Sequence, residues 1–256
     1  MKKSSYNYKV YFTINKITLL LYFFYKIDKD LISRAFKFYK IKIYLSVLFR
    51  IFVLQLSEKM TKAEQTRQFI IEKTAPIFNK KGYAGTSLSD ITNATGLTKG
   101  SIYGNFLNKE EVGLAVFKYN TKELSKKIKA WISKKNNAYE KLIAFLDFYR
   151  NNWRYISDNG GCPYLNSATE SDDVMPAMKV LVRSTFENWE DNISAIIDEG
   201  RDRGLFKNDI NVVEYSKSFI MMIEGGILLA KISDDPADLH LMLNRIKKII
   251  DEEIVK

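Results

Sequence analysis

A short stretch near residue 100 carries side chains whose chemistry suits the phosphates and base edges of a nucleic acid. Lys99 and Lys109 offer ammonium groups, and Gly100 would let a sugar-phosphate strand approach the backbone closely. Neutral hydrogen-bonding groups come from Thr86, Thr98, Ser101, Tyr103 and Asn105. The stretch 86–109 contains no Arg, so the bidentate guanine contact that dominates direct readout is absent. We therefore expect phosphate binding to outweigh base readout, with specificity drawn from neutral side chains and DNA shape.

Two short helices are needed to position these groups. Ser87 followed by Asp90 is typical of a capping box, which predicts a helix that begins near Ser87, and Gly96 can supply the left-handed residue that ends it. Thr98 can then cap a second helix. The apolar residues expected to point inward are Leu88, Ile91, Ala94, Leu97, Ile102 and Phe106. Two short helices joined by a turn with Gly form a helix-turn-helix, whose second helix enters the major groove.

At these positions the chain resembles the TetR family of bacterial transcriptional repressors. The resemblance covers a leading helix over about 61–81, the G-Y-x-G-T segment at 82–86, the A-x-G-L-T turn at 94–98, and G-S-I-Y-G-N-F followed by N-K-E-E. Asn105 departs from the pattern, because many members carry His before the Phe. The resemblance implies a homodimeric repressor that binds a palindromic DNA operator and is released by a small-molecule effector.

The positive charge of the chain is concentrated in two places. The whole chain carries a formal +10, but residues 1–59 hold twelve Lys and Arg against three acidic residues. Residues 60–109 hold seven basic residues against three acidic ones, while the rest of the chain is slightly acidic. The argument for DNA binding therefore depends on the local positive field around the helix-turn-helix rather than on the total charge.

Residues 1–59 differ in composition from the rest of the chain. They contain no Gly or Pro and fourteen aromatic residues, so they resemble neither a linker nor a disordered tail. The uncharged run 17–25 is about half the length of a membrane span. We interpret this segment as a doubtful N-terminal extension, because its residue types are those that AT-rich DNA encodes. Met60 is the expected start. A basic interfacial membrane anchor is the alternative.

From Asn108 onwards the pattern is helical almost throughout. Apolar residues recur at helical spacing over about 108–135, 139–156, 176–200, 212–232 and 236–254, and no strand pattern competes. We therefore predict an all-α chain. A homeodomain-like, three-helix head with the helix-turn-helix would occupy 60–107, and a helical effector-binding and dimerisation domain would occupy 108–256.

The body should contain a dimer surface and an effector pocket if the resemblance holds. Gly225 and Gly226 lie inside an apolar helix at a cost of roughly 1 kcal/mol each, which a close helix contact across a dimer interface would explain. A local kink is the alternative. The segment 160–166 resembles a G-G-C-P segment that lies beside the ligand cavity in one TetR subgroup. The residues expected to line a pocket for an apolar or aromatic effector are Phe148, Trp153, Cys162, Tyr164, Met178, Phe186, Trp189, Met221 and Met222.

Cys162 is the only cysteine and His240 the only histidine. A single cysteine excludes an intrachain disulfide and fits a reducing cytoplasm. These two residues lie far apart in the sequence and supply neither a transition-metal site nor a nucleophilic catalytic set, so we expect no enzyme activity, no metal and no cofactor. Two alternatives stay open beside a DNA-binding repressor: a regulator anchored to a membrane through residues 1–59, and one that senses oxidants through the Cys162 thiol.

Overall fold

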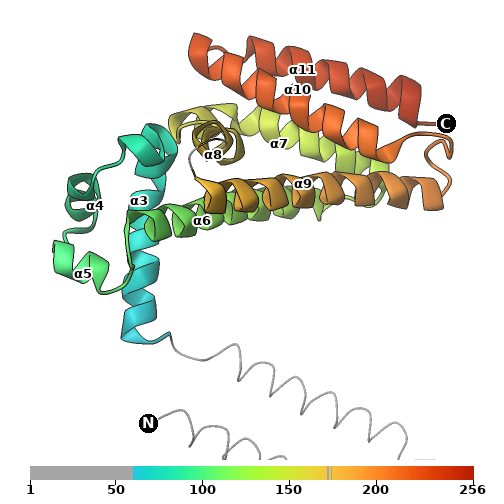
Figure 1. Cartoon of the computed structure of the whole chain (residues 1–256). Coiled ribbons are helices and arrows are strands. Elements are labelled where there is room, and N and C mark those ends of the chain that lie inside the picture. The colour runs from blue at the N-terminus through green and yellow to red at the C-terminus, as the bar shows by residue number, and fades with distance from the viewer. Residues whose placement is uncertain (1–59, 172, 174) are drawn as a thin grey trace, which may run out of the picture. The chain divides into compact units, whose positions relative to one another are not determined.

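In the described part of the chain the regular elements are helices, with one isolated antiparallel bridge between Phe206 and Val255, so the prediction of an all-α fold is confirmed (Figure 1). This computed structural model describes residues 60–171, 173 and 175–256. The expectations for residues 1–59, including the extension and the membrane anchor, lie outside the described part. The residues from Thr61 to Lys256 form one compact unit.

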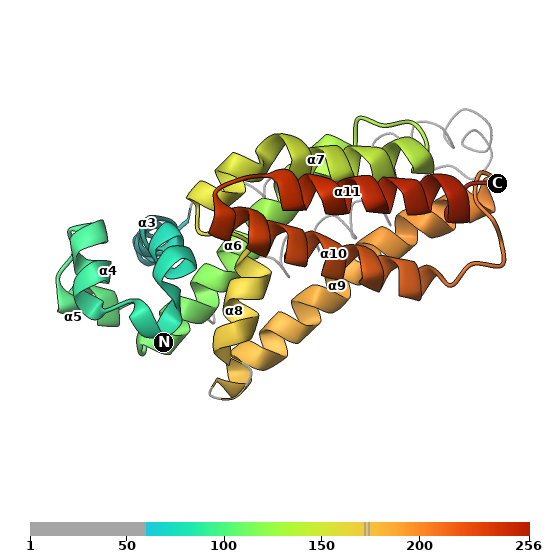
Figure 2. The ribbon, with the colours of Figure 1, turned by 90° about the horizontal axis from the view of Figure 1, so that it is seen from above.

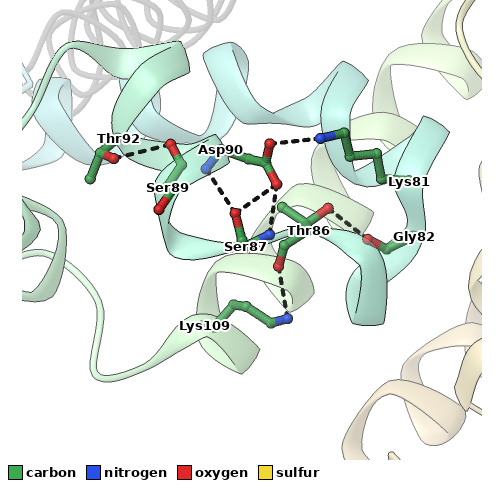
Figure 3. Close-up of polar contacts among 8 residues, drawn as sticks. All are labelled: Lys81, Gly82, Thr86, Ser87, Ser89, Asp90, Thr92 and Lys109. Carbon is green, nitrogen blue, oxygen red and sulfur yellow. Dashed lines mark hydrogen bonds and ion pairs between the residues drawn. The ribbon is translucent and has the colours of Figure 1, made fainter.

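Three helices form the N-terminal head, and their boundaries follow the capping signals. They are α3 (Lys62–Gly85), α4 (Leu88–Thr95) and α5 (Lys99–Tyr103). Thr61 with Glu64 forms a capping box at the start of α3, and Ser87 with Asp90 forms another at the start of α4 (Figure 3). Each pair provides acceptors for backbone N–H groups that the first turn of a helix leaves without partners.

Two glycines with positive φ separate the helices of the head. Gly96 has a φ of 68° and ends α4, and Gly82 has a φ of 74° and interrupts α3 near its end. Such backbone angles are readily adopted by glycine because it has no Cβ. Thr98 then caps α5, because its Oγ1 accepts the backbone N–H of Ser101 at 3.2 Å. The predicted start and stop signals of the helix-turn-helix are therefore confirmed.

Six longer or intermediate helices and a terminal π-helix build the body in the described part of the chain. They are α6 (Lys109–Ile132), α7 (Ala138–Asp158), α8 (Pro163–Ser171), α9 (Pro176–Asp202), α10 (Val212–Ser233), α11 (Ala237–Ile249) and η1 (Ile250–Ile254). The structure makes α8 a helix of its own, where the sequence analysis identified only a distinctive segment. Figures 1 and 2 show α10 and α11 side by side along one side of the body.

Helix α7 lies at the centre of the body. It packs against α6, α9, α10 and α11 and buries Phe145, Phe148 and Tyr149. The head is joined to this body through α3, which packs against both α6 and α8. A displacement of α6 or α8 in the body therefore acts directly on the helix that carries the helix-turn-helix.

Candidate functional site

Helix α5 presents a small exposed surface over a buried base. Ile102 and Phe106 are buried and hold the helix on the head, with exposed fractions of 0% and 2%. The exposed residues on the outer side are Thr98, Lys99, Gly100 and Tyr103, and Ser101 is half-buried. The structure thus brings five of the eight predicted DNA-binding residues together on one short helix and its cap. An ammonium group, hydroxyls and an open backbone at Gly100 are groups that can contact a phosphate strand.

The side chain of Asn105 is turned back on its own helix. Its Nδ2 donates to the carbonyl oxygen of Ser101 at 2.9 Å, and the residue is half-buried. The amide that could have pointed freely outward is therefore partly used to close the end of α5. This hydrogen bond leaves fewer donors of the Asn105 amide free for another partner.

Thr86 was expected to contact DNA, and its position in the structure corrects that expectation. The residue is fully buried, and its Oγ1 donates to the carbonyl oxygen of Gly82 at 2.6 Å (Figure 3). Its hydroxyl closes the turn that follows the break at Gly82. Thr86 therefore stabilises the turn that precedes the helix-turn-helix, and its buried side chain is not accessible to DNA.

Lys109, which was also expected to contact a phosphate, donates to carbonyl oxygens of its own chain. Its Nζ donates to the carbonyl oxygens of Tyr83 and Thr86 at 2.7 and 2.8 Å and lies 4.3 Å from the centre of the Tyr83 ring (Figure 3 draws the Thr86 contact). A cation at the start of α6 is unfavourable for the helix dipole. The carbonyl oxygens at the end of α3 and at Thr86 compensate for that unfavourable position.

Arg67 is a residue of the head that the sequence analysis missed. Its Nη1 donates to the carbonyl oxygen of Asn105 at 2.5 Å, its Nη2 pairs with Glu111 at 2.6 Å, and its guanidinium lies 4.0 Å from the centre of the Phe106 ring. The backbone N–H of Leu107 and Arg67 together lower the pKa of Glu111. Arg67 thus joins α3 to the end of α5 and the start of α6. Because the partners are 38 and 44 residues away, no local spacing could have revealed this role.

A second ion pair holds α4 against α3. Lys81 Nζ lies 2.6 Å from Asp90, whose other oxygen accepts the backbone N–H of Ser87 at 2.8 Å (Figure 3). These contacts lower the pKa of the Asp90 carboxyl far below its usual range, and the hydrogen bond from Lys81 has the largest effect. Asp90 therefore keeps its charge and serves both the helix cap and the α3–α4 contact.

The head is also tied to α8 of the body. Glu170 Oε2 accepts the backbone N–H groups of Tyr83 and Ala84 at 2.6 and 3.1 Å. Asn79 adds a second tie, because its Nδ2 donates to the carbonyl oxygens of Asn159 and Gly161. The segment 79–84, which precedes the helix-turn-helix, is therefore held at both of its ends by contacts with body residues.

The body contains a cavity of about 630 Å³ between α6, α7, α8 and α9. This volume is within the range of small-molecule sites. Its apolar surface includes Ile128, Phe145, Tyr149, Tyr164, Trp189 and Ile193. Of the nine predicted pocket residues, only Tyr164 and Trp189 line this cavity. Phe145, Tyr149 and Ile193 are cavity residues that the sequence analysis did not select, because the apolar spacing of a core residue and of a cavity residue is the same.

The other seven predicted pocket residues lie elsewhere. Met221 is 66% exposed on the outer surface of α10, so its assignment to a pocket is wrong. Trp153 lies under the Arg154 guanidinium, and Met178 packs with Phe117, Met175 and Val182. The remaining four pack in or against the main core without lining the cavity: Phe148, Cys162, Phe186 and Met222.

Cys162 forms a buried pair with Glu224, which directly precedes Gly225 in α10. The thiol Sγ donates to Glu224 Oε1 at 2.8 Å. Burial raises the pKa of Glu224 to about 7 and raises the pKa of the Cys162 thiol well above its ordinary value. Since the thiolate is the reactive form, a buried thiol with a raised pKa is a poor oxidant sensor. The geometry therefore disfavours the thiol-sensing alternative.

Gly226 has a role within the chain rather than between chains. A Cβ at this position would lie 3.0 Å from the Cα of Leu239, so glycine allows α10 to pack closely on α11. This corrects the expectation that Gly226 marks a contact with a second copy. Gly225 is exposed, and a Cβ there would contact nothing within 4 Å. Large apolar side chains are exposed on the same two helices: Met221, Leu228, Leu229, Ile232 and Leu241.

Comparisons with known proteins agree with this two-part architecture. Residues 70–116 match the family described as "Bacterial regulatory proteins, tetR family", and residues 138–246 match "Tetracyclin repressor-like, C-terminal domain". The structure of a TetR-family transcriptional regulator from Cytophaga hutchinsonii is 38% identical, with a TM-score of 0.75, and the match covers 78% of this chain and 100% of that one. The chain belongs to the TetR family of transcriptional regulators. The G-G-C-P subgroup stays a prediction.

Other TetR-family proteins are similar over most of their length. A TetR regulator from Chloroflexus aurantiacus J-10-FL is 32% identical with a TM-score of 0.70, and the match covers 77% of this chain and 99% of that one. The transcriptional repressor DhaR of Mycobacterium sp. (strain GP1) is 27% identical over 68% of this chain and 88% of its own length. These relatives are transcriptional regulators, and this TetR-family chain is accordingly a regulator and not an enzyme. No helix in the described ranges is long and apolar enough to cross a bilayer.

Proposed function

We propose that this TetR-family chain is a repressor that binds a palindromic operator as a homodimer and leaves it when a small molecule binds to the body. The observation that carries the proposal is the exposed surface of α5, with Lys99, Gly100 and Tyr103 outward and Ile102 buried beneath. In a helix-turn-helix the second helix enters the major groove, and its side chains contact phosphates and base edges. We assign the DNA contacts to Thr98, Lys99, Gly100, Ser101 and Tyr103, with a lesser contact from Asn105.

The exposed apolar side chains of α10 support a homodimer. Met221, Gly225, Leu228 and Ile232 follow one another at intervals of four, three and four residues, which places them on one helix face. Met221 and Ile232 are 66% and 74% exposed. A contiguous apolar face of this kind marks an interaction site, and two copies related by a two-fold axis would each cover the face of the other. The dimer would then present two α5 helices to two half-sites.

Effector release would act through the two helices that connect cavity and head. Tyr164 lines the cavity near the start of α8, and Glu170 on the same helix accepts the N–H groups of Tyr83 and Ala84. Helix α6 also lines the cavity and begins at Lys109, which closes the turn after α3. A ligand that binds one arrangement of α6 and α8 more tightly would shift the population of head positions, and DNA affinity would fall by that difference in binding free energy.

A gel-shift assay tests the DNA-binding proposal directly. The full chain is titrated against the DNA that flanks its own gene, with an unrelated fragment of equal length as competitor, at several salt concentrations. We expect a shift that survives the competitor and weakens as salt rises, because phosphate contacts release counterions. Equal binding to both fragments at every salt concentration would contradict the proposal.

A further inference from the structure

The cavity combines an aromatic floor with an uneven distribution of charge along its rim. Lys118, Lys122 and Lys129 line it from α6, together with Ser125. Positions 118, 122, 125 and 129 are spaced by four, three and four residues, so they share one face of that helix. All three lysines are exposed, which places them at the mouth of the cavity and not on its floor.

Part of the opposite rim, on α9, carries neutral polar side chains. It contributes Thr185, Asn188 and Asn192. The Nδ2 groups of both asparagines donate to carbonyl oxygens one turn earlier in their own helix. These three positions of α9 therefore place no acid opposite the lysine row, and the acid that α9 contributes to the cavity is Glu199.

The acid that lines the cavity, Glu199, is already paired. One of its oxygens lies 2.5 Å from Lys141 Nζ, and the other lies 3.1 Å from Arg203. Lys118, Lys122 and Lys129 form no ion pair with residues of the described part of the chain. Like charges four residues apart on a helix repel each other, so this row is unfavourable for α6 by itself. An anion at the mouth of the cavity would remove that repulsion.

The floor beneath this rim is apolar and aromatic. Tyr164 and Trp189 lie with their ring centres 5.0 Å apart, and Phe145, Tyr149 and Ile193 complete the floor. Aromatic rings of this kind pack well against a planar apolar molecule. The charged rim and aromatic floor are thus suited to different ends of one ligand.

We infer that the cavity binds an aromatic carboxylate, or a similar amphipathic aromatic anion, with its ring on Tyr164 and Trp189 and its charge beside Lys118 and Lys122. The inference rests on the proposed effector role of the cavity and adds the chemical class of the ligand. A neutral or cationic aromatic molecule of equal size would lose the interaction with the lysine row and bind more weakly.

Three probes of nearly equal shape test the inference by calorimetric titration of the full chain. They are 2-naphthoate, which is anionic, 2-naphthamide, which is neutral, and 2-naphthamidine, which is cationic. We expect 2-naphthoate to bind about tenfold more tightly than 2-naphthamide, with 2-naphthamidine the weakest, and the preference to shrink as salt rises. Equal or tighter binding of the amide or the amidine would overturn the inference.

Two lysine variants distinguish a cavity role from an ordinary solvated lysine. Lys122→Gln should weaken 2-naphthoate severalfold and leave 2-naphthamide unchanged, so amide binding also reports whether the variant is folded. Lys126→Gln is the matched control, because Lys126 is exposed on the same helix but does not line the cavity. An equal loss of naphthoate binding in both variants would show a general charge effect and would overturn the inference.

The DNA assay separates this inference from the proposed function. If 2-naphthoate binds in a Lys122-dependent way but leaves the gel shift unchanged, the ligand class is supported and effector release by this ligand class is not. If only neutral or cationic aromatic molecules release the DNA, the proposed effector role is supported and the ligand class is wrong.

Discussion

Glu170 on α8 holds the backbone N–H of Tyr83 at 2.6 Å, at the point where α3 gives way to the helix-turn-helix. The same carboxylate oxygen accepts the N–H of Ala84 at 3.1 Å. Gly82 lies against this carboxylate so closely that a methyl group there would overlap Oε1. A single acidic side chain of the body therefore fixes the backbone conformation on which the orientation of α4 and α5 depends.

The first prediction concerns this tie. We expect Glu170→Ala to lower the free energy of unfolding by about 1–3 kcal/mol, because the half-buried N–H of Tyr83 and the exposed N–H of Ala84 lose a charged acceptor. Urea denaturation measures the change. Thr169→Ala is the control, since Thr169 is exposed on the same helix and should change stability by less than about 0.5 kcal/mol.

Gly82→Ala extends the same test. Alone it should be strongly destabilising, because a Cβ both strains a φ of 74° and overlaps Glu170. In a Glu170→Ala background the overlap disappears, so the two substitutions together should cost about 1 kcal/mol less than the sum of their separate effects. If the changes in unfolding free energy are simply additive, the close contact between Gly82 and Glu170 does not affect stability.

The second prediction separates a DNA-binding lysine from a structural one. Lys99→Ala should weaken operator binding and reduce the slope of log affinity against log salt by about 0.9, the contribution of one phosphate contact. Lys126→Ala, an exposed lysine of the body, is expected to leave the slope unchanged. Fluorescence anisotropy at four or more salt concentrations gives the slopes, and equal slopes for both variants would remove Lys99 from the interface.

The third prediction follows from the contacts of Lys109 within its own chain. Lys109→Met keeps an apolar stem but removes the donors to the carbonyl oxygens of Tyr83 and Thr86. We expect a loss of about 1–3 kcal/mol in unfolding free energy and an unchanged salt slope for the DNA that still binds. A reduced slope with unaltered stability would restore Lys109 as a phosphate contact.

The fourth prediction uses the buried Glu224. Burial raises the pKa of its carboxyl to about 7 from an ordinary value of 4.5, so the folded state binds the proton more tightly than the unfolded chain. The stability this proton provides is complete below pH 4.5 and is lost as the pH rises through 7, by roughly 3 kcal/mol in total. The neighbouring groups on which the Glu224 charge acts are Cys162, Tyr149 and Tyr164. Burial, first, and this charge raise their pKa values, so they stay neutral over this range.

Glu224→Gln tests the pH effect because the amide has the same shape and no titration in this range. We expect the variant to match the parent chain near pH 4.5 and to exceed it in unfolding free energy at pH 8. Urea denaturation at both pH values decides the matter. A constant difference between variant and parent would show that Glu224 does not titrate in the folded state.

The fifth prediction concerns the apolar face of α10. Ile232→Asp places a charge in the proposed dimer interface and should convert the dimer to a monomer with weakened operator binding. Val180→Asp is a matched control, because Val180 is 70% exposed on α9 while Ile232 is 74% exposed on α10. Sedimentation equilibrium measures the mass of each variant, and a dimeric Ile232→Asp protein would place the interface elsewhere.

The head shows which features of a fold can be predicted locally. The caps at Ser87 and Thr98 and the stop at Gly96 depend on residues within four positions of one another, and all three were predicted. The roles of Lys109 and Arg67 depend on partners 23 to 44 residues away. A basic side chain near a helix-turn-helix can bind either a phosphate or a carbonyl oxygen that is distant in the sequence. The residue type alone therefore could not distinguish a DNA contact from a structural one.

The body shows where apolar spacing stops being informative. Met221 and Tyr149 both occupy apolar positions of long helices, yet Met221 is exposed and Tyr149 is fully buried at a cavity. Which face of a helix meets the core, a cavity or a second copy depends on the packing of several helices at once. Gly226 illustrates the same limit, because its small size serves a contact with Leu239 in the neighbouring helix α11.

The frame of the head and its reading surface are made of different residues. Arg67, Ile102 and Phe106 hold α5 in place, whereas Lys99 and Tyr103 project from it. Under the proposed function, substitutions at the projecting positions would alter operator preference without removing a contact that orients the helix. This division would let a duplicated copy of the gene acquire a new target site in single steps that keep the fold.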